Sequence, residues 1–178
     1  MEKSANNIKL LPKPALQAKG KRPCNRVNLP VYSINSTDAK GNANMHIITY
    51  ATAISMKPKR FVCGIYHGTQ TLKNVEAKPH FALQLLAATQ YRLVDLLGKK
   101  SGRLVNKISR LEKRNELFEW NEFKILKNCL AVMELKVIAE MEGGDHKIFL
   151  CDIAAYKNLN EGEALTLNIL REHKLIRV

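Results

Sequence analysis

The sequence predicts a mainly β protein, an antiparallel β-barrel with peripheral α-helices. Several segments have the β-branched and apolar composition of strands, and most of them follow one another directly in the chain. Short turns join these segments, and no internal repeat or low-complexity block interrupts them. Strands that are neighbours in sequence usually pair antiparallel, so the pattern favours a barrel or a sandwich over a parallel sheet. Of these two, we expect the barrel.

The first four expected strands are bounded by turn residues. A polar run over residues 36–42 separates the first two, and Lys57-Pro58 ends the second. Proline lacks the N–H that a strand ladder needs, which suits a strand end. The four strands are predicted at residues 27–35, 44–55, 61–66 and 81–86.

A β-hairpin is predicted over residues 130–156. Apolar and polar residues alternate before its loop, which contains Gly143 and Gly144, and an apolar run follows it. Glycine supplies the positive φ values that such loops need. The loop brings Asp145 and His146 to the head of a buried strand, where a histidine beside a carboxylate is a candidate ligand-facing group. The competing interpretation is a surface histidine in an ordinary hairpin.

Helices are expected between the strands. One over residues 69–78 would have Thr69 as its N-cap and would be closed by Pro79. A second, over residues 89–97, would end at Gly98. A third, amphipathic helix is predicted from the apolar positions Leu104, Ile108 and Leu111.

The net charge of +13, from 29 Lys and Arg against 16 Asp and Glu, is concentrated in two places. Residues 1–26 hold seven basic residues and one acid, and residues 99–114 have the same balance. Such clusters attract anions, and the candidates are a phosphate-bearing cofactor, a dinucleotide, a nucleic acid or simply solvent. No aromatic residue interleaves with either cluster, which argues against stacking on nucleic-acid bases.

The length suits one domain over residues 27–178, preceded by a poorly ordered basic arm over residues 1–26. Residues 165–178 fit either a helix or an edge strand. The four cysteines are widely spaced, so buried free thiols in a cytoplasmic protein are expected rather than disulfides or a metal site. No apolar run approaches the ~20 residues of a membrane span, and lysines interrupt the N-terminus where a secretory signal would need an apolar core.

Common nucleotide-binding and nucleophile motifs are absent. The run Gly98-Lys99-Lys100-Ser101 lacks the earlier glycine and the directly following hydroxyl residue of a P-loop. No G-x-G-x-x-G follows a strand, and no G-x-S-x-G elbow occurs. A nucleotide cofactor would therefore need a barrel-type site.

Five features, in order, resemble the flavin reductase-like family, whose fold is the FMN-binding split barrel, and the likeness spans residues 29–156. Residues 44–58 are similar to the family's N-G-M-T-x-S … V-S-x-x-P segment, and Thr71 falls where the family has a hydroxyl residue after its second long strand. The other three likenesses are residues 81–86 to F-A-V-N-V-L, residues 101–107 to S-G-R-x-V-D-K, and residues 144–149 to G-D-H-x-x-F.

The resemblance implies a homodimeric oxidoreductase that binds FMN, with FAD as the alternative. It would take hydride from NADH or NADPH and pass electrons to an acceptor protein or a monooxygenase. It also implies that His146 lies near the flavin or the nicotinamide, as a candidate catalytic residue that orients the reductant or donates a proton. A flavin ring needs a flat apolar slot with polar groups at its edge, and its phosphate needs donors and positive charge. The expected ring-edge residues are Asn44, Thr49, Tyr50, Ala51, Thr52 and Gln84, and the expected phosphate residues are Thr69, Thr71, Arg103 and Lys107.

Four positions depart from the family pattern. Gln84 replaces an asparagine, Lys59 replaces a proline, and Cys151 and Asp152 stand where glycine and glutamate are common. A cysteine beside the flavin would narrow the slot, and together the departures argue for slower NAD(P)H-driven turnover. The second hypothesis is therefore a flavoredoxin-like electron carrier that holds FMN tightly and oxidises little NAD(P)H. The third is a nucleic-acid-binding protein.

Overall fold

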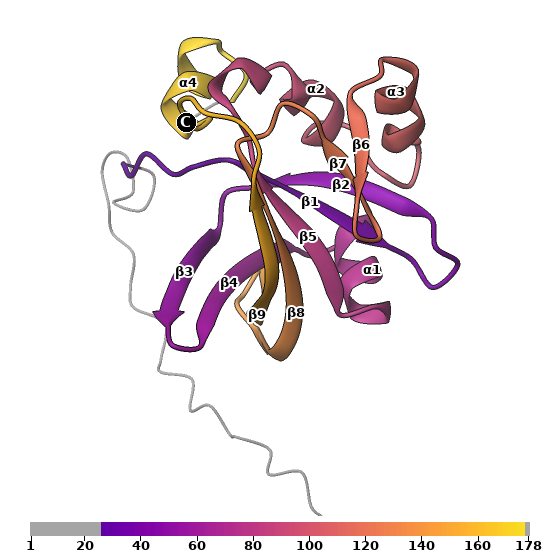
Figure 1. Cartoon of the computed structure of the whole chain (residues 1–178), viewed down its shortest axis with the longest axis vertical. Coiled ribbons are helices and arrows are strands. Elements are labelled where there is room, and N and C mark those ends of the chain that lie inside the picture. Colours follow the sequence, from indigo (N-terminus) through magenta and orange to yellow (C-terminus); the bar gives the residue numbers. More distant parts are fainter. Residues whose placement is uncertain (1–25, 177–178) are drawn as a thin grey trace, which may run out of the picture.

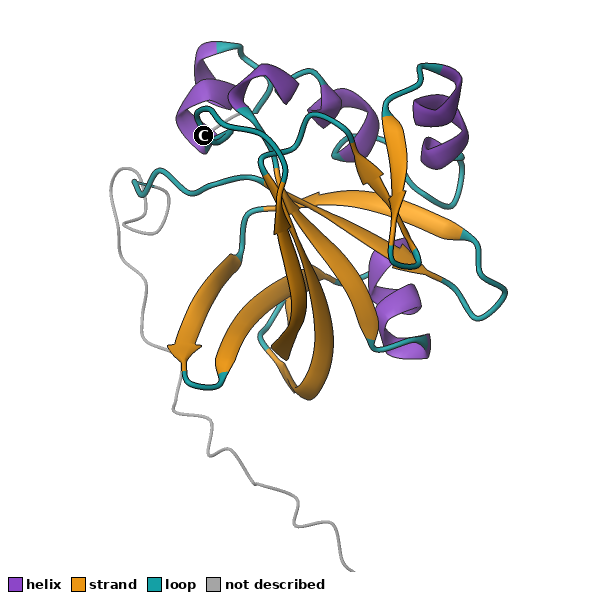
Figure 2. Cartoon of the chain, in the orientation of Figure 1, coloured by secondary structure: helices purple, strands orange, loops and turns teal. Residues whose placement is uncertain are grey.

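The computed structural model describes residues 26–176, and strands dominate this part of the chain (Figures 1 and 2). The strands are β1 (Tyr32–Thr37), β2 (Ala43–Ile48), β3 (Ala51–Met56), β4 (Lys59–Tyr66), β5 (His80–Leu85), β6 (Leu117–Trp120), β7 (Phe123–Leu126), β8 (Ala131–Glu142) and β9 (His146–Asn158). The α-helices are α1 (Gln70–Ala77), α2 (Leu93–Leu97), α3 (Lys107–Lys113) and α4 (Leu167–Glu172). The predicted basic arm, except Arg26, lies outside the described residues.

Seven strands form one antiparallel sheet in the order β2-β1-β5-β8-β9-β4-β3, and β6 and β7 form a separate hairpin. The two edges of the sheet are β2 and β3, which do not pair with each other within residues 26–176. The sheet therefore curves without closing, and Figure 1 shows β3 and β4 diverging from β1 and β2. The prediction of a mainly β, antiparallel split barrel with peripheral helices is confirmed.

The single strand predicted over residues 44–55 is wrong, because it is two strands at opposite edges of the sheet. The chain turns at Thr49 and Tyr50, between β2 and β3. Gly64 of β4 donates its N–H to the Tyr50 carbonyl at 2.7 Å, which holds this corner against the β3–β4 pair. β-Type composition continues through the corner, so the local pattern gives no sign of the break.

The core has two parts, separated by the sheet. One lies beneath α2, α3, α4 and the β6–β7 hairpin, and the other lies on the side of α1. β5 contributes to both, since Ala82 packs in the first part while Phe81 and Leu83 pack in the second. A strand buried on both faces reads as a continuous apolar run rather than an alternating one.

The helices follow the predicted caps only in part. Thr69 is the N-cap of α1, and its side chain accepts a hydrogen bond from the Leu72 N–H at 3.1 Å. α2 is shorter than expected because a 3₁₀ turn over Ala88–Gln90 precedes it. α3 begins after Asn106, whose side chain caps it, so Leu104 lies outside the helix and is 87% exposed. In the ambiguous segment of residues 165–178, Thr166 pairs with Pro30 in an isolated β-bridge and residues 167–172 form α4.

The long β8–β9 hairpin confirms the prediction for residues 130–156, whereas the β6–β7 hairpin was not predicted. Among the described cysteines, Cys63, Cys129 and Cys151 are buried free thiols, as expected. Cys151 packs in the core on the side of α1 and does not narrow a surface slot. No described helix is long and apolar enough to cross a membrane.

Candidate functional site

Three adjoining hollows on one side of the molecule form a single groove. Its polar end has a volume of about 350 Å³ and lies between β2, the start of α1 and the loop after α2. Its middle is narrower, about 180 Å³, and shares His46 and Tyr66 with the polar end. Its apolar end, about 420 Å³, lies over β3, β4 and the start of β9. The residues that the middle shares with the apolar end are Thr49, Tyr50, Gly64 and His146.

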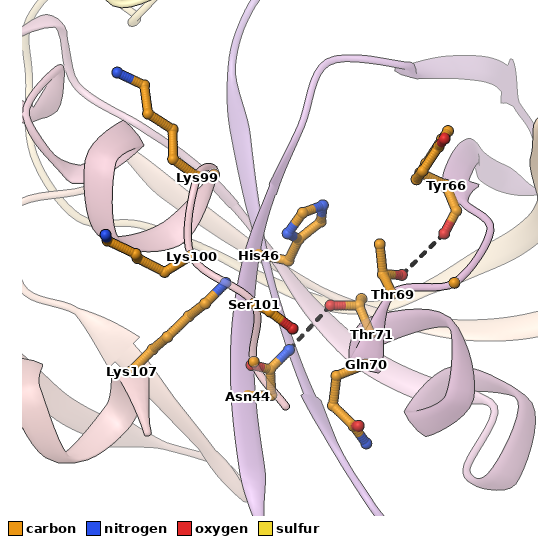
Figure 3. A pocket seen from close by; sticks show the side chains of 13 residues that line it. Asn44, His46, Tyr66, Thr69, Gln70, Thr71, Lys99, Lys100, Ser101 and Lys107 are labelled. Carbon is orange, nitrogen blue, oxygen red and sulfur yellow. Dashed lines mark hydrogen bonds between the residues drawn. The ribbon is translucent and has the colours of Figure 1, made fainter. Parts of the chain in front are cut away.

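The floor of the polar end is built from β2 and α1. Asn44 of β2 is buried and donates its side-chain N–H to the Thr71 hydroxyl at 3.0 Å (Figure 3). The loop after α2 closes over Asn44 at Gly102, where an added Cβ would lie 2.3 Å from the Asn44 Oδ1. A side chain at residue 102 would therefore displace the Asn44 amide, so Gly102 lets the loop lie close to Asn44.

Thr69 and Thr71, the two threonines of the polar end, differ in whether the hydroxyl proton is free to donate to a ligand. The Thr69 hydroxyl donates to the Tyr66 carbonyl at 2.9 Å and accepts from the Leu72 N–H, so its proton is already used in capping. The Thr71 hydroxyl accepts from Asn44 and keeps its own proton for another partner. Thr71 is therefore the better hydrogen-bond donor toward the groove.

Unpaired backbone donors surround the polar end. In the first turn of α1, the N–H groups of Gln70 and Thr71 have no acceptor among the described residues. The same holds across the groove for the N–H groups of Lys100, Ser101 and Gly102. Such N–H groups, with the positive end of a helix dipole, form an anion-binding site.

Lys107, the first residue of α3, is the charged group buried beside this end. It is 2% exposed, and its ammonium group donates to the Leu97 carbonyl at 2.8 Å. Burial lowers the pKa of Lys107 to about 8. The side chains of Lys99 and Lys100 instead extend away from His46 and Thr71 (Figure 3), and Lys99 forms an ion pair with Asp95 at 2.7 Å.

His46 lies two residues after Asn44 on the same face of β2 and reaches the middle of the groove. Burial lowers its pKa to about 4, and the charge of Lys107 acts in the same direction. The imidazole is therefore neutral at neutral pH. No prediction from the sequence included His46, although its two-residue spacing from Asn44 was a signal for a shared face.

Apolar and small residues make up much of the lining of the apolar end. Ala51 of β3, Val62 and Gly64 of β4, and Ile148 of β9 contribute to its walls. A Cβ at Gly64 would lie 3.2 Å from the Tyr50 Cβ, so a larger residue would crowd the corner. An apolar surface with polar groups nearby suits an aromatic ring system.

His146 lies where the apolar end meets the middle. Its Nδ1 is 2.7 Å from an Asp145 carboxylate oxygen, which lowers the pKa of Asp145 through this hydrogen bond. Its ring contacts the Tyr50 and Tyr66 rings edge-on, with centroid distances of 5.0 and 5.3 Å. The Asp145 carboxylate thus favours a tautomer with the proton on Nδ1, leaving Nε2 as the acceptor.

The structure brings nine of the predicted site residues to this groove and leaves two outside it. The nine are Asn44, Thr49, Tyr50, Ala51, Thr52, Thr69, Thr71, Lys107 and His146. Asn44 lies at the polar end, not at the apolar end where it was expected. Arg103 is exposed and does not line the groove.

Gln84 is the clearest correction. It is completely buried on β5, and its side-chain oxygen accepts from the Leu126 N–H at 2.7 Å. It therefore faces the β6–β7 hairpin and not a ligand. No group of three metal-ligating side chains occurs in residues 26–176.

Known structures share this fold. An FMN-binding protein from Thermus thermophilus, solved with p-hydroxybenzaldehyde, is 21% identical with a TM-score of 0.71, and the match covers 86% of this chain and 90% of that one. A flavoredoxin from Methanosarcina acetivorans is 19% identical with a TM-score of 0.69, over 84% and 81% of the two chains. The styrene monooxygenase flavin reductase from Pseudomonas putida S12 is 14% identical with a TM-score of 0.66, over 82% and 89%. No curated protein sequence gives a significant match.

The family model described as "Flavin reductase like domain" matches residues 24–175, which include every strand and helix described above and the whole groove. The chain therefore belongs to the flavin reductase-like family.

Proposed function

We propose that this protein binds FMN in the groove and reduces it with NADH or NADPH. One observation carries the proposal: a single groove joins an end lined by unpaired N–H groups and Lys107 to an apolar end, within a flavin reductase-like domain. FMN has the matching layout, with a phosphate at one end and a ring at the other. When bound, it would supply the ring that accepts hydride.

The donors at the polar end fit a phosphate. Lys107 has ammonium N–H groups beyond the one that the Leu97 carbonyl accepts, and the Thr71 hydroxyl proton is free. The unpaired N–H groups of α1 and of residues 100–102 add neutral donors. A buried lysine whose pKa is lowered to about 8 gains most from a nearby anion, because the anion offsets the cost of burying its charge.

The apolar end fits the ring. Ala51, Val62 and Ile148 would contact its faces, and Thr49 and Thr52 would offer hydroxyls to its polar edge. These residues hold the ring in one orientation and exclude water from one side of it. FAD has the same ring, so it remains the alternative cofactor.

We assign His146 the role of orienting the reductant or donating a proton. Its Asp145 partner and its two tyrosine neighbours fix the ring, and its side chain is 19% exposed, so an incoming ligand can reach it. His146→Ala should slow flavin reduction while leaving FMN affinity nearly unchanged. A wild-type rate in that variant would rule out this role.

The open apolar face supports a homodimer as part of the proposal. β3 is an edge strand, and its Ile54 and Met56 are 53% and 81% exposed. The apolar end of the groove opens beside this strand, so a second copy would complete it. Electrons would then pass to an acceptor protein or a monooxygenase component. The free thiols at Cys63, Cys129 and Cys151 fit a cytoplasmic location.

Purified protein tests the proposal in two steps. It should bind FMN during gel filtration, or quench FMN fluorescence in a titration, and it should then oxidise NADH or NADPH when FMN is present. Binding of FMN without NAD(P)H oxidation would instead indicate the flavoredoxin-like carrier. Failure to bind or reduce any flavin would refute the proposal.

A further inference from the structure

His46 occupies the narrow middle of the groove, between the two ends that the proposed function assigns. It lines both the polar end and the middle. Its neighbours in the middle include Tyr66 and His146, whose Nδ1 is already committed to Asp145. A ligand with its phosphate at the polar end and its ring at the apolar end would therefore place the part that joins them next to His46.

The chemistry of His46 suits a neutral hydroxyl group and not an anion. Burial and the Lys107 charge lower its pKa to about 4, so it does not compete with Lys107 for the phosphate. A neutral imidazole has one nitrogen that accepts and one that donates. No hydrogen bond from a described side chain uses that accepting nitrogen. In FMN, a short carbon chain that carries hydroxyl groups links the ring to the phosphate.

We propose that His46 binds this hydroxyl chain, accepting a hydrogen bond from one of its hydroxyl groups. The inference rests on the proposed function and adds to it. It makes His46 a residue that distinguishes flavins with a polyol chain from flavins without one.

Three flavins separate the parts of the groove. FMN has ring, polyol chain and phosphate, riboflavin lacks the phosphate, and lumiflavin lacks both the phosphate and the chain. We expect His46→Ala to weaken binding of FMN and riboflavin alike, each by about fivefold, the loss of one neutral hydrogen bond. Lumiflavin affinity should not change. Dissociation constants would come from quenching of flavin fluorescence.

Conservative variants test whether hydrogen bonding, rather than packing, is responsible. The side-chain oxygens of His46→Asn and His46→Gln approximate the positions of the two ring nitrogens, so one of these variants should recover most of the affinity. His173→Ala is the matched control, because His173 stacks on Tyr91 near α4 and does not line the groove. It should bind all three flavins as the wild type does.

A measurement on the wild-type protein tests the same contact without any variant that could fold poorly. The ring nitrogen signals of His46 in a ¹⁵N NMR spectrum should shift on adding riboflavin and stay in place on adding lumiflavin. Equal losses for all three flavins in His46→Ala, or no loss for any, would overturn the inference. If the wild type bound none of the three, the proposed function itself would fail.

Discussion

At the scale of the residue, the proposed FMN site would give the buried charge of Lys107 a role. It is buried, and the Leu97 carbonyl is its hydrogen-bond acceptor. A buried ammonium group costs stability relative to an apolar side chain, and its lowered pKa expresses that cost. An anion bound at the polar end would offset this cost.

This reasoning predicts that FMN affinity falls as the pH rises above about 8. A phosphate dianion favours the charged lysine, so the pKa of Lys107 is higher in the complex than in the free protein. Binding then takes up a proton between these two values, and the affinity falls by up to about tenfold per pH unit. Fluorescence titrations between about pH 6 and pH 10 would measure it, with riboflavin as the reference that lacks the phosphate.

Two variants of α3 make this prediction specific to Lys107. Lys107→Met should weaken FMN binding by about tenfold or more and remove its dependence on pH above 8. Lys113→Met, at an exposed position of the same helix, should retain both. FMN affinity that stays constant with pH in the wild type would show that Lys107 does not contact the phosphate.

At the scale of the element, side chains of the main sheet hold the β6–β7 hairpin in place. The Asn35 side chain donates to the Lys124 carbonyl at 2.6 Å, and the Gln84 side chain accepts from the Leu126 N–H at 2.7 Å. Both side chains are completely buried. These side chains hydrogen-bond to backbone groups of β7 that a neighbouring strand would otherwise pair with.

Gln84→Ala should therefore lower the free energy of unfolding by about 1–3 kcal/mol, because it leaves the buried Leu126 N–H without an acceptor. Urea denaturation would measure the loss, and Asn128→Ala, at an exposed position, should show little change. FMN affinity should stay at the wild-type value, since Gln84 does not line the groove. If Gln84→Ala lost FMN affinity but kept its free energy of unfolding, Gln84 would contact the edge of the flavin ring as the sequence predicts.

Elements specified by local patterns could be predicted from the sequence, and those specified by distant contacts could not. The Thr69 cap and the β8–β9 hairpin depend on neighbouring residues, and both were predicted. The corner at Thr49 depends on long-range pairing, since β2 pairs with β1 while β3 pairs with β4. The face of β5 on which Gln84 lies could not be predicted from the sequence. Both faces of β5 are buried, so apolar and polar residues do not alternate along the strand.

The candidate site shows the same limit. Most of its side chains could be named from the family resemblance, whereas the unpaired N–H groups of residues 100–102 carry no side-chain signal. Thr69 and Thr71 look equivalent in the sequence. Only the structure shows that the Thr69 proton is used in capping while the Thr71 proton is free.

At the scale of the whole molecule, one edge strand of the main sheet carries exposed apolar side chains. β3 is that edge, and a β-bulge at Ile54 turns an apolar side chain outward. An unpaired strand edge with exposed apolar residues promotes pairing with another chain. Because the apolar end of the groove opens beside β3, one contact between two copies would cover both the edge and the ring.

Ile54→Lys should therefore convert a dimer to a monomer and weaken FMN binding together, since one interface supports both. Analytical ultracentrifugation would give the mass, and fluorescence quenching would give the affinity at the same protein concentration. Leu104→Lys is the matched control, because Leu104 is 87% exposed in the loop before α3 and does not line the groove. A dimer that survives Ile54→Lys would place the interface elsewhere. A monomeric variant with full affinity would mean that one copy holds the ring alone, so assembly and cofactor binding would be independent.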